Sequence, residues 1–546
     1  MAGLAASFGS GAMTNSIAEL EHSDCILVIG SNTTETHPVT STFIKRAARL
    51  HNKTLIVAEP RRIDLVRHAS LWLRQRPGTD IAVINGLMQV IISENLQDKA
   101  YVAERTEGFE ALKEKVARYT PEYVEQISGV PAEDLRRAAR LYAQARAASI
   151  VYAMGITQHT VGTDNVKSLA NLAMLCGNVG IEGGGVNPLR GQNNVQGACD
   201  MGGLPNVFSG YQPVTDAKAR AKMEAAWGVE NLPDWVGLTM TDMVPVIPQG
   251  KIKALYIIGE NPVVSDPDSD HLVKAFQQLD FLVVQDIFLT ETARLADVVL
   301  PATTFAEKEG TFSNTERRVA RVRQAIPPRG DSRPDWQIIA EISRRLGYPM
   351  DYAGPEAIFE EIRQVTPSYA GITYARLEAE GGLQWPCPAT DHPGTVYLHK
   401  GQFARGKGQF FAIDHRDPAE MPDADYPLIL TTGRLLYQYH TGTMSRRAPG
   451  LEERAPECRI EIAAADADHR GIKDGDSVRI KTRRGAIVAR AQVSPRAVAG
   501  TVFLPFHFFE APANKLTIAA LDPVAKIPEY KVCAVHMEKA SSGGNL

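Results

Sequence analysis

Two stretches of the same pattern decide the fold: Leu27-Val28-Ile29-Gly30-Ser31-Asn32 and Tyr256-Ile257-Ile258-Gly259-Glu260-Asn261. In each of them, an apolar run typical of a buried strand ends in Gly-x-Asn. Pro38 and Pro267 each lie eight residues beyond the glycine of their own copy. A pattern that recurs in the same order indicates a duplicated ligand-binding unit.

An acidic residue closes the next apolar run in both copies. Glu59 follows Leu55-Ile56-Val57-Ala58, and Asp286 follows Leu282-Val283-Val284-Gln285, at 29 and 27 residues beyond the glycine. Glycine lets the backbone approach a phosphate or base closely, and a carboxylate can accept hydrogen bonds from ribose or guanine. Each copy alone is also typical of an ordinary strand-to-helix turn. Because the pattern is repeated, we expect two nucleotide-like sites in one chain.

The rest of the chain predicts the architecture around this repeat. Helical spacing of apolar residues predicts an amphipathic helix over residues 131–146, and a strand follows over residues 149–152. Residues 417–426 are expected to form a linker, because Pro418 and Pro422 interrupt any helix. Glu420, Asp423 and Asp425 are expected to keep this segment solvated. Alternating residues on both sides of Arg484-Gly485 predict a hairpin. We therefore expect an α/β protein with two related doubly wound dinucleotide-binding domains, residues 1–192 and 193–416, and a C-terminal β-barrel domain, residues 426–546.

Composition limits the class of protein. The chain has 546 residues, 44% of them hydrophobic, and a formal net charge of only -4. These values are typical of a globular protein of several domains, and they indicate neither a nucleic-acid partner nor a membrane span. The 6 cysteines are scattered without a C-x-x-C pair, so reduced thiols in the cytoplasm are the simplest interpretation.

Two polar clusters are candidates for chemistry. In Arg190-Gly191-Gln192-Asn193-Asn194-Val195-Gln196, side-chain amides and one arginine crowd a loop, and the fork of Arg190 can hold a carboxylate by two hydrogen bonds. A solvated turn is the alternative. The second cluster, Gly433-Arg434-Leu435-Leu436-Tyr437-Gln438-Tyr439-His440, could line a polar ligand. His440 alone is more typical of a structural histidine, and His507 of a core position.

The longer stretch Arg190-Gly191-Gln192-Asn193-Asn194-Val195-Gln196-Gly197-Ala198-Cys199-Asp200-Met201-Gly202 closely resembles the molybdopterin-dependent formate dehydrogenases. The similarity runs along nearly the whole chain and includes Val284-Gln285-Asp286-Ile287-Phe288 and Ile527-Pro528-Glu529-Tyr530-Lys531. It implies molybdenum or tungsten held by two molybdopterin guanine dinucleotides (bis-MGD), one for each half of the repeat. It also implies a last domain of the double-psi barrel type. Formate, held by Arg190, would be oxidised to carbon dioxide, or the reverse.

The resemblance also implies the cofactor-binding residues. One dinucleotide would be served by Gly30, Asn32, Glu59, Arg61, Gly78 and Asp80, and the other by Gly259, Glu260, Asn261, Gln285, Asp286 and Asp335. The pterins would be approached by Met154, Gly155, Gln158, Gly191, Gln192, Arg434, His440 and Asn514. Ser31, Glu35, Thr36, Pro60, Gly433 and Gln438 complete the predicted cofactor site.

The chain departs from the family pattern at its start. Family members carry a cysteine or selenocysteine metal ligand, followed by histidine, just before the segment resembling Ala2-Gly3-Leu4, and a cysteine-rich domain upstream. In this chain no cysteine precedes Cys25, so no protein ligand to the metal is predicted here. We hypothesise that Met1 is an internal start after a selenocysteine codon taken for a stop. A 4Fe-4S cluster is then expected only in the upstream segment.

Partners and alternatives follow from this departure. Electron-transfer subunits or a further domain are the expected partners besides formate. A chain that truly begins at Met1 is expected to bind the cofactor weakly and to lack formate oxidation. The alternatives are another bis-MGD oxidoreductase, such as a nitrate reductase, and a noncatalytic cofactor-binding remnant.

Overall fold

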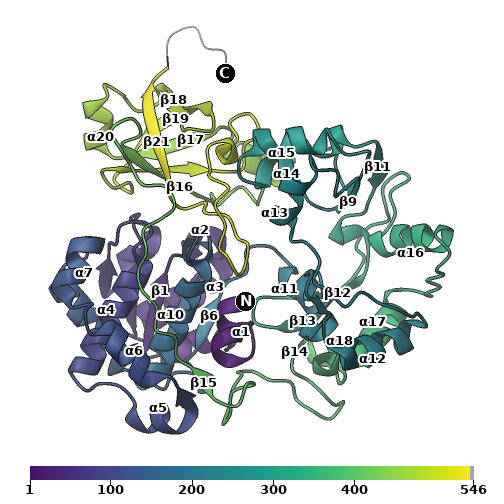
Figure 1. Cartoon of the computed structure of the whole chain (residues 1–546), viewed down its shortest axis with the longest axis horizontal. Helices are drawn as coiled ribbons and strands as arrows, with labels where there is room; N and C mark the ends of the chain where they lie inside the picture. Colours follow the sequence, from purple (N-terminus) through teal and green to yellow (C-terminus); the bar gives the residue numbers. More distant parts are fainter. Residues whose placement is uncertain (541–546) are drawn as a thin grey trace. The chain divides into compact units, whose positions relative to one another are not determined.

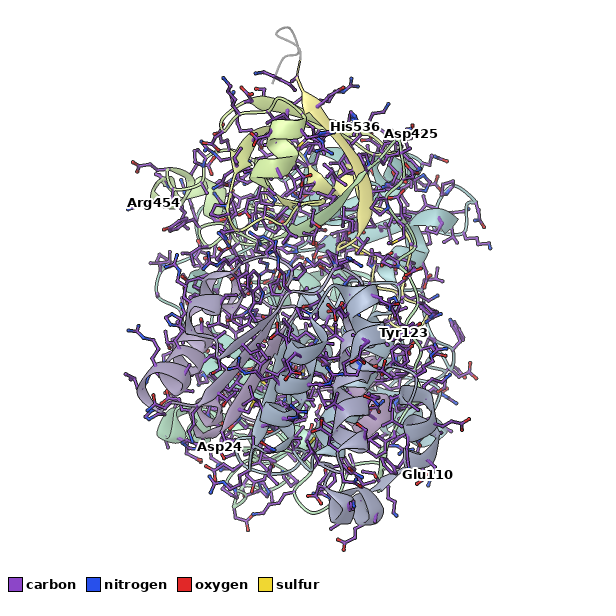
Figure 2. All side chains as sticks on the ribbon, turned by 90° about the vertical axis from the view of Figure 1, so that its left-hand side faces the viewer. Asp24, Glu110, Tyr123, Asp425, Arg454 and His536 are labelled. Carbon is purple, nitrogen blue, oxygen red and sulfur yellow. The ribbon has the colours of Figure 1, made fainter. Side chains whose placement is uncertain are left out.

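The computed structural model describes residues 1–540 of the chain, which divide into two compact units. Unit 1 comprises Met1–Gly191, Val264–Asp270 and Tyr397–Leu546, and unit 2 comprises Gln192–Val263 and His271–Val396. Charged side chains such as those of Glu110, Asp425 and Arg454 point outward from unit 1 (Figure 2). Within residues 1–540, no helix combines the length and the apolar character that crossing a bilayer requires.

A five-stranded parallel sheet forms the centre of unit 1, in the order β3-β2-β1-β5-β6. Its strands pair in register along parallel neighbours, with Ile29 opposite both Ala58 and Tyr152. Their bounds are β1 Cys25–Ile29, β2 Thr54–Ala58, β3 Leu71–Leu73, β5 Ala148–Tyr152 and β6 Val186–Pro188. The strands predicted from the apolar runs of the first copy are therefore present.

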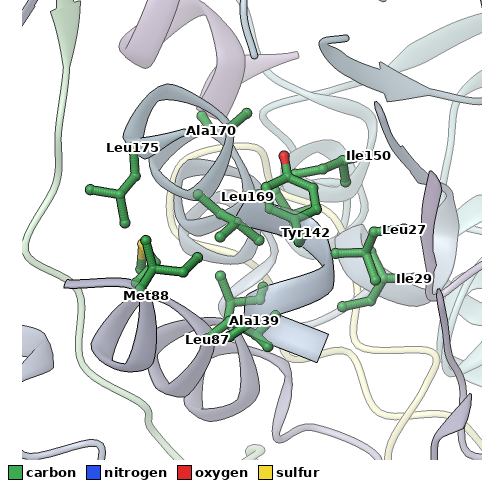
Figure 3. Packing of buried hydrophobic residues seen from close by; sticks show 14 of the residues in the cluster. Leu27, Ile29, Leu87, Met88, Ala139, Tyr142, Ile150, Leu169, Ala170 and Leu175 are labelled. Carbon is green, nitrogen blue, oxygen red and sulfur yellow. The ribbon is translucent and has the colours of Figure 1, made fainter. Parts of the chain in front are cut away.

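Helices cover both faces of this sheet, because alternate strand residues point to opposite sides. Leu27 and Ile29 pack in one cluster with Leu87 of α4 (Asp80–Ser93) and Leu169 of α10 (Gly162–Leu175), as Figure 3 shows. Ile26 and Val28 pack on the opposite face with α3 (Pro38–Leu50). The predicted amphipathic helix is α8 (Ala132–Ala143), and its apolar side is buried as expected.

The internal duplication is present in the structure. In unit 2, β9 (Ala254–Ile258), β10 (Phe281–Asp286) and β11 (Val298–Pro301) form a parallel sheet in the order β11-β10-β9, which repeats the order β3-β2-β1. Two helices follow the first strand in each copy, α2 (Thr33–Thr36) and α3 in one, and α14 (Pro262–Ser265) and α15 (Ser269–Phe276) in the other. A 3-10 helix precedes the third strand in both, at Asp64–His68 and Ala293–Leu295.

The two sheets differ in burial. Leu282 and Val284 pack against Leu272 and Phe276 of α15, so one face of the second sheet is covered. On the other face Tyr256, Ile258 and Phe281 are 40%, 44% and 46% exposed. The apolar run of β9 is therefore not buried on both sides, unlike β1, whose residues are all buried.

The remaining elements of unit 2 form short helices and a small antiparallel sheet. The sheet has the order β12-β13-β14. The bounds are α11 Val195–Asp200, α12 Ala217–Trp227, α13 Met240–Met243, β12 Gly310–Ser313, β13 Arg318–Val322, α16 Asp335–Arg345, α17 Pro355–Val365, α18 Tyr374–Glu380 and β14 Leu383–Gln384. The other α-helices of unit 1 are α1 Ala2–Phe8, α5 Lys99–Arg105, α6 Phe109–Val116, α7 Pro121–Ser128, α9 Met154–Thr157, α19 Pro449–Glu452 and α20 Ala464–His469.

The C-terminal part is a closed barrel in the order β16-β20-β17-β19-β18-β21 (Figure 1). The bounds are β16 Leu428–Gly433, β17 Arg459–Ile462, β18 Ser477–Lys481, β19 Ala486–Val493, β20 Thr501–Pro505 and β21 Cys533–Lys539. The predicted hairpin is β18 paired antiparallel with β19. Leu430, Ile480 and Val502 lie in the core. The α/β class with a C-terminal barrel is thus confirmed.

The segment before the barrel has no helix, as predicted, but Glu420 is not solvated as expected. Its side chain is only 9% exposed and forms ion pairs with Arg484 and Arg483 at 2.8 Å and 2.9 Å. It also accepts the backbone N–H of Ala534 at 2.9 Å. These partners, distant in sequence, offset the desolvation of the carboxylate, so the expectation was wrong for Glu420, whereas Asp423 and Asp425 are exposed as predicted.

Candidate cofactor and substrate site

The carboxyl end of the first sheet brings two predicted site glycines into backbone contact. Gly30 follows β1 with a φ of 56°, and the Gly155 N–H donates to the Gly30 carbonyl at 3.0 Å. A Cβ on Gly155 would meet the Gly30 oxygen at 2.5 Å, and one on Gly30 would meet the Gly155 carbonyl carbon at 2.8 Å. Only glycine allows this close approach of the chain ends after β1 and β5. In open parallel sheets, ligands bind at such an edge.

Buried polar atoms without protein partners gather on the loop after β1. The side chains of Ser31 and Thr33 are 3% and 0% exposed, and their hydroxyls accept and donate no hydrogen bond. Both amide atoms of Asn32 and one carboxylate oxygen of Glu35, Oε2, are likewise buried without a hydrogen-bond partner. Buried polar groups in folded proteins are nearly always paired, so this set suits a polar ligand. Thr36 differs, because its hydroxyl donates to the Asn32 carbonyl at 2.9 Å.

Three titratable groups near this loop have perturbed pKa values. Burial raises the pKa of Glu59 to about 7, although the nearby Arg61 opposes the shift. Burial lowers the pKa of Lys531 to about 8, and its ammonium donates to the Thr432 carbonyl at 2.6 Å. Burial also raises the pKa of Asp80, which begins α4. Such clusters are typical of functional sites.

Other predicted residues use their polar atoms within unit 1. The Arg61 guanidinium forms a bidentate ion pair with Glu461 at 2.8 Å and lies 3.4 Å over the ring of Phe503. The Gln438 amide donates to Glu452 at 3.1 Å and accepts from a serine hydroxyl. The Asn514 amide donates to the carbonyls of Val264 and Ser265. These side chains organise the protein around the site.

The loop that carries Arg190 is anchored at three successive residues. The Leu189 N–H donates to the Tyr152 carbonyl at 2.9 Å. His37 Nε2 donates to the Arg190 carbonyl at 2.6 Å, and Arg434 Nη1 donates to the Gly191 carbonyl at 2.7 Å. This anchoring is unlike a solvated turn. It holds the backbone of Arg190 in one place.

Two histidines near Arg434 have lowered pKa values. Burial, and next the charge of Arg434, lower the pKa of His440 to about 4. Burial lowers the pKa of His507 to about 3, and its Nε2 accepts the N–H of Leu435. His507 is fully buried in the barrel, as expected for a core position.

In unit 2 the second set of predicted residues is also brought together. Gly259 has a φ of 63°, and its N–H donates to the Gln285 carbonyl at 2.9 Å, just as the Gly30 N–H donates to the Ala58 carbonyl at 3.1 Å. Gln285 Nε2 donates to Asp335 Oδ1 at 2.7 Å, and Lys308 forms an ion pair with the same carboxylate. The side chains of Asn261 and Asp286 also form hydrogen bonds, with Glu291 and with the Ile287 N–H respectively.

The remaining predicted residues occupy simple positions. Met154 is 38% exposed at the start of α9, and the Gln158 N–H donates to its carbonyl. Pro60 lies between Glu59 and Arg61, Glu260 follows Gly259, Gln192 begins unit 2, Gly433 ends β16, and Gly78 has a φ of 84°. Within residues 1–540, no group of three His, Cys, Asp or Glu side chains is arranged to hold a metal ion.

Sequence reasoning missed two basic residues of the site. Arg496 Nη2 donates to Glu35 Oε1 at 2.5 Å, while its Nε is buried without a hydrogen-bond partner. Lys531 lies in the stretch that carries the family resemblance, but nothing in its own pattern marks it. Both lie more than 400 residues beyond the loop after β1, so only the folded chain brings them there.

Comparison with known proteins agrees with this geometry. Residues 4–345 match the family "Molybdopterin oxidoreductase", and residues 428–534 match "Molydopterin dinucleotide binding domain". The F420-dependent formate dehydrogenase subunit alpha of Methanocaldococcus jannaschii is 53% identical over 98% of this chain and 80% of that protein. Formate dehydrogenase H of Escherichia coli is 42% identical over 98% of this chain and 76% of that protein.

A solved structure shares the fold. Acetylene hydratase from Pelobacter acetylenicus aligns with a TM-score of 0.76 over 99% of this chain and 80% of that chain, at 21% identity. The two family matches, the relatives and the duplicated loops agree with one another. The chain therefore belongs to the molybdopterin oxidoreductase family and, within it, to the formate dehydrogenase alpha subunits.

Proposed function

We propose that this chain oxidises formate to carbon dioxide, or catalyses the reverse, with a molybdenum or tungsten centre carried by bis-MGD. The observation that carries the proposal is Arg190, fixed by His37 and Arg434 at the carboxyl end of the first sheet. A planar arginine fork fits a carboxylate by two charge-assisted hydrogen bonds. A small, planar monocarboxylate is the substrate that suits one such fork.

The residues after β1 fit the cofactor. Ser31, Asn32 and Glu35 have buried polar atoms without hydrogen-bond partners. These atoms are donors and acceptors that can pair with the donors and acceptors of a guanosine. Gly30 and Gly155 leave room for a phosphate against the backbone. In this proposal Glu59 and Asp80 accept hydrogen bonds from ribose or guanine, and Lys531 and Arg434 balance the charge of the pterin and phosphates. When bound, the cofactor supplies the metal that takes up two electrons.

The charge change in the reaction indicates the role of Arg190 in this proposal. Formate carries one negative charge, whereas carbon dioxide is neutral, and the reaction releases two electrons and one proton. Arg190 therefore binds the substrate more tightly than the product and orients its C–H bond, so that product leaves readily. The substrate loop is fixed in advance, which lowers the entropy lost on binding.

We further propose electron transfer to another subunit or domain, because several relatives are named as alpha subunits. We also place the enzyme in the cytoplasm. All six cysteines, which lie among the described residues, are free thiols, and free thiols suit a reducing compartment.

Arg190→Lys tests the proposal in the holoenzyme, with Arg459→Ala as a matched control at an exposed barrel position. Lysine keeps the charge but loses the fork, so we expect KM for formate to rise roughly tenfold to a hundredfold. Metal and guanine contents should stay at the level of the control. Formate-dependent dye reduction measures the kinetics, and nitrate replaces formate as the comparison substrate. An unchanged KM for formate in Arg190→Lys would reject the assigned role.

A further inference from the structure

We propose that the two guanine dinucleotides are held unequally, with residues 30–36 (the first loop) ready for a ligand and residues 259–263 (the second loop) closed on itself. This inference rests on the proposed function, because it takes the guanine dinucleotide as the ligand of both loops. It concerns the hydrogen bonds that each loop must break when a ligand binds. Residues 30–36 lie in unit 1 and residues 259–263 lie in unit 2, and the contacts compared below are all inside one unit.

The side chains of Ser31, Asn32 and Thr33 in the first loop have no hydrogen bond that a ligand must break. The Asn32 side chain carries one acceptor and two donors, and both of its polar atoms are buried without a partner in this part of the chain. The hydroxyls of Ser31 and Thr33 are in the same condition, and both residues are at least nine-tenths buried. The desolvation of these groups is already part of the folded state. A ligand that pairs them therefore gains hydrogen bonds without losing any from the protein.

The second loop is closed by its asparagine. Asn261 Oδ1 accepts the Thr292 hydroxyl at 2.7 Å and the Thr292 N–H at 3.2 Å. Asn261 Nδ2 donates to Glu291 Oε2 at 2.8 Å, and the Val263 N–H donates to the Thr292 hydroxyl at 3.2 Å. A ligand that engages the Asn261 side chain must displace some of these bonds. Binding there is weaker by the free energy of the bonds lost.

One difference in sequence explains the contrast. Thr292 precedes the 3-10 helix Ala293–Leu295, and the residue that precedes the corresponding helix Asp64–His68 in the first copy is Ile63. Ile63 is buried in the apolar cluster beside α3 and has no polar side-chain atom. The first copy therefore has nothing at this position to pair with its asparagine. The identical Gly-x-Asn motif is left open in one copy and occupied in the other.

The consequence is an order of binding. Each hydrogen bond that need not be broken is worth about 1 kcal/mol in general, which is about fivefold in affinity, so two or three bonds give roughly tenfold to a hundredfold. The first loop binds the dinucleotide end that it meets before the second loop binds its own, which follows after Asn261 is released from Thr292.

Calorimetric titration with GDP tests the inference, because GDP contains the guanosine and phosphates without the pterin. The chain is produced in a host that cannot make the cofactor, so that both loops start without it. We expect one equivalent to bind tightly and a second at least tenfold more weakly. Asn32→Ala should weaken the tight equivalent roughly tenfold to a hundredfold. Thr292→Val should strengthen the weak equivalent roughly tenfold, whereas Thr292→Ser keeps the hydroxyl and should match the wild type.

Each outcome decides the proposal. Two equivalents of equal affinity, no GDP binding, or an Asn32→Ala variant that binds as the wild type would overturn it. Thermal melting of each variant identifies a loss of folding, and a conservative Asn32→Asp exchange then replaces Asn32→Ala. The proposed function is judged separately, by acid extraction of the loaded holoenzyme. Equal binding to the two loops leaves that function standing, whereas an absence of extracted GMP removes it.

Discussion

Replacing His37 tests whether the substrate arginine is positioned by its backbone. Burial lowers the pKa of His37, so its ring is neutral, and a carbonyl can only accept. Nε2 therefore carries the hydrogen that it donates to the Arg190 carbonyl at 2.6 Å, and Nδ1 lies 2.8 Å from the Thr36 hydroxyl. His37→Ala removes this donor and leaves a partly buried carbonyl unpaired. The loss is about 1–3 kcal/mol, which corresponds to roughly fivefold to a hundredfold in the occupancy of the ordered loop.

The kinetic expectation follows from where Arg190 acts. In the proposed role the Arg190 fork holds formate in both the ground state and the transition state, so His37→Ala should raise KM for formate by roughly tenfold and change kcat less. His37→Gln offers an amide N–H to the same carbonyl and should recover most of the loss. Steady-state dye reduction by the holoenzyme measures both constants, with guanine content as the loading control. Kinetics of His37→Ala and His37→Gln within twofold of each other would refute the reasoning.

Three further predictions concern the stability of the chain without cofactor. The pKa of Glu59 is raised from 4.5 to about 7. The stability that protonated Glu59 contributes to the folded chain is therefore fully present below about pH 4.5 and is lost as pH rises through about 7. Relative to the wild type, Glu59→Gln should therefore gain free energy of unfolding as pH rises across that window, up to about 3 kcal/mol at its upper end. Urea titrations at both ends measure this difference, and equal values for the two proteins at the upper end would contradict the prediction. Gly30→Ala should destabilise by about 2 kcal/mol more than Gly259→Ala, because both have positive φ but only Gly30 has backbone atoms at 2.8 Å from the added Cβ; equal urea midpoints would be against this. Asp200→Asn should cost about 3 kcal/mol, because this buried carboxylate accepts four side-chain hydrogen bonds, and a fluorescence-detected unfolding curve like that of the wild type would rule it out.

Local patterns predicted the elements of the first copy well. The apolar runs of β1 and β2, the spacing of the repeat and the apolar side of α8 depend on neighbours in sequence, and the structure has them at the expected places. The hairpin of β18 and β19 was likewise predictable from alternation around a turn. Such features need no knowledge of what packs against them.

The side-chain partners were not predictable in the same way. The guanidinium of Arg61, a predicted cofactor residue, pairs with Glu461, which lies 400 residues later in the chain and which no local pattern marks as its partner. Glu420 was expected in solvent, yet it pairs with Arg483 and Arg484 of the barrel. An ion pair between distant residues leaves no periodicity or spacing in the sequence. Only the closure of the barrel next to the first sheet brings such charges together.

The two Gly-x-Asn loops show where sequence identity stops being informative. Gly30 and Gly259 have the same sign of φ and the same backbone hydrogen bond to the neighbouring strand, so the motif does fix the backbone. Whether the asparagine side chain is hydrogen-bonded depends on a residue outside the motif, Ile63 in one copy and Thr292 in the other. A duplicated motif thus specifies where a ligand can lie, whereas a single residue about 30 positions later determines how readily the loop receives it. Reading a repeat for function therefore requires comparing the residues that pack on each copy, because equal motifs need not have equal affinity.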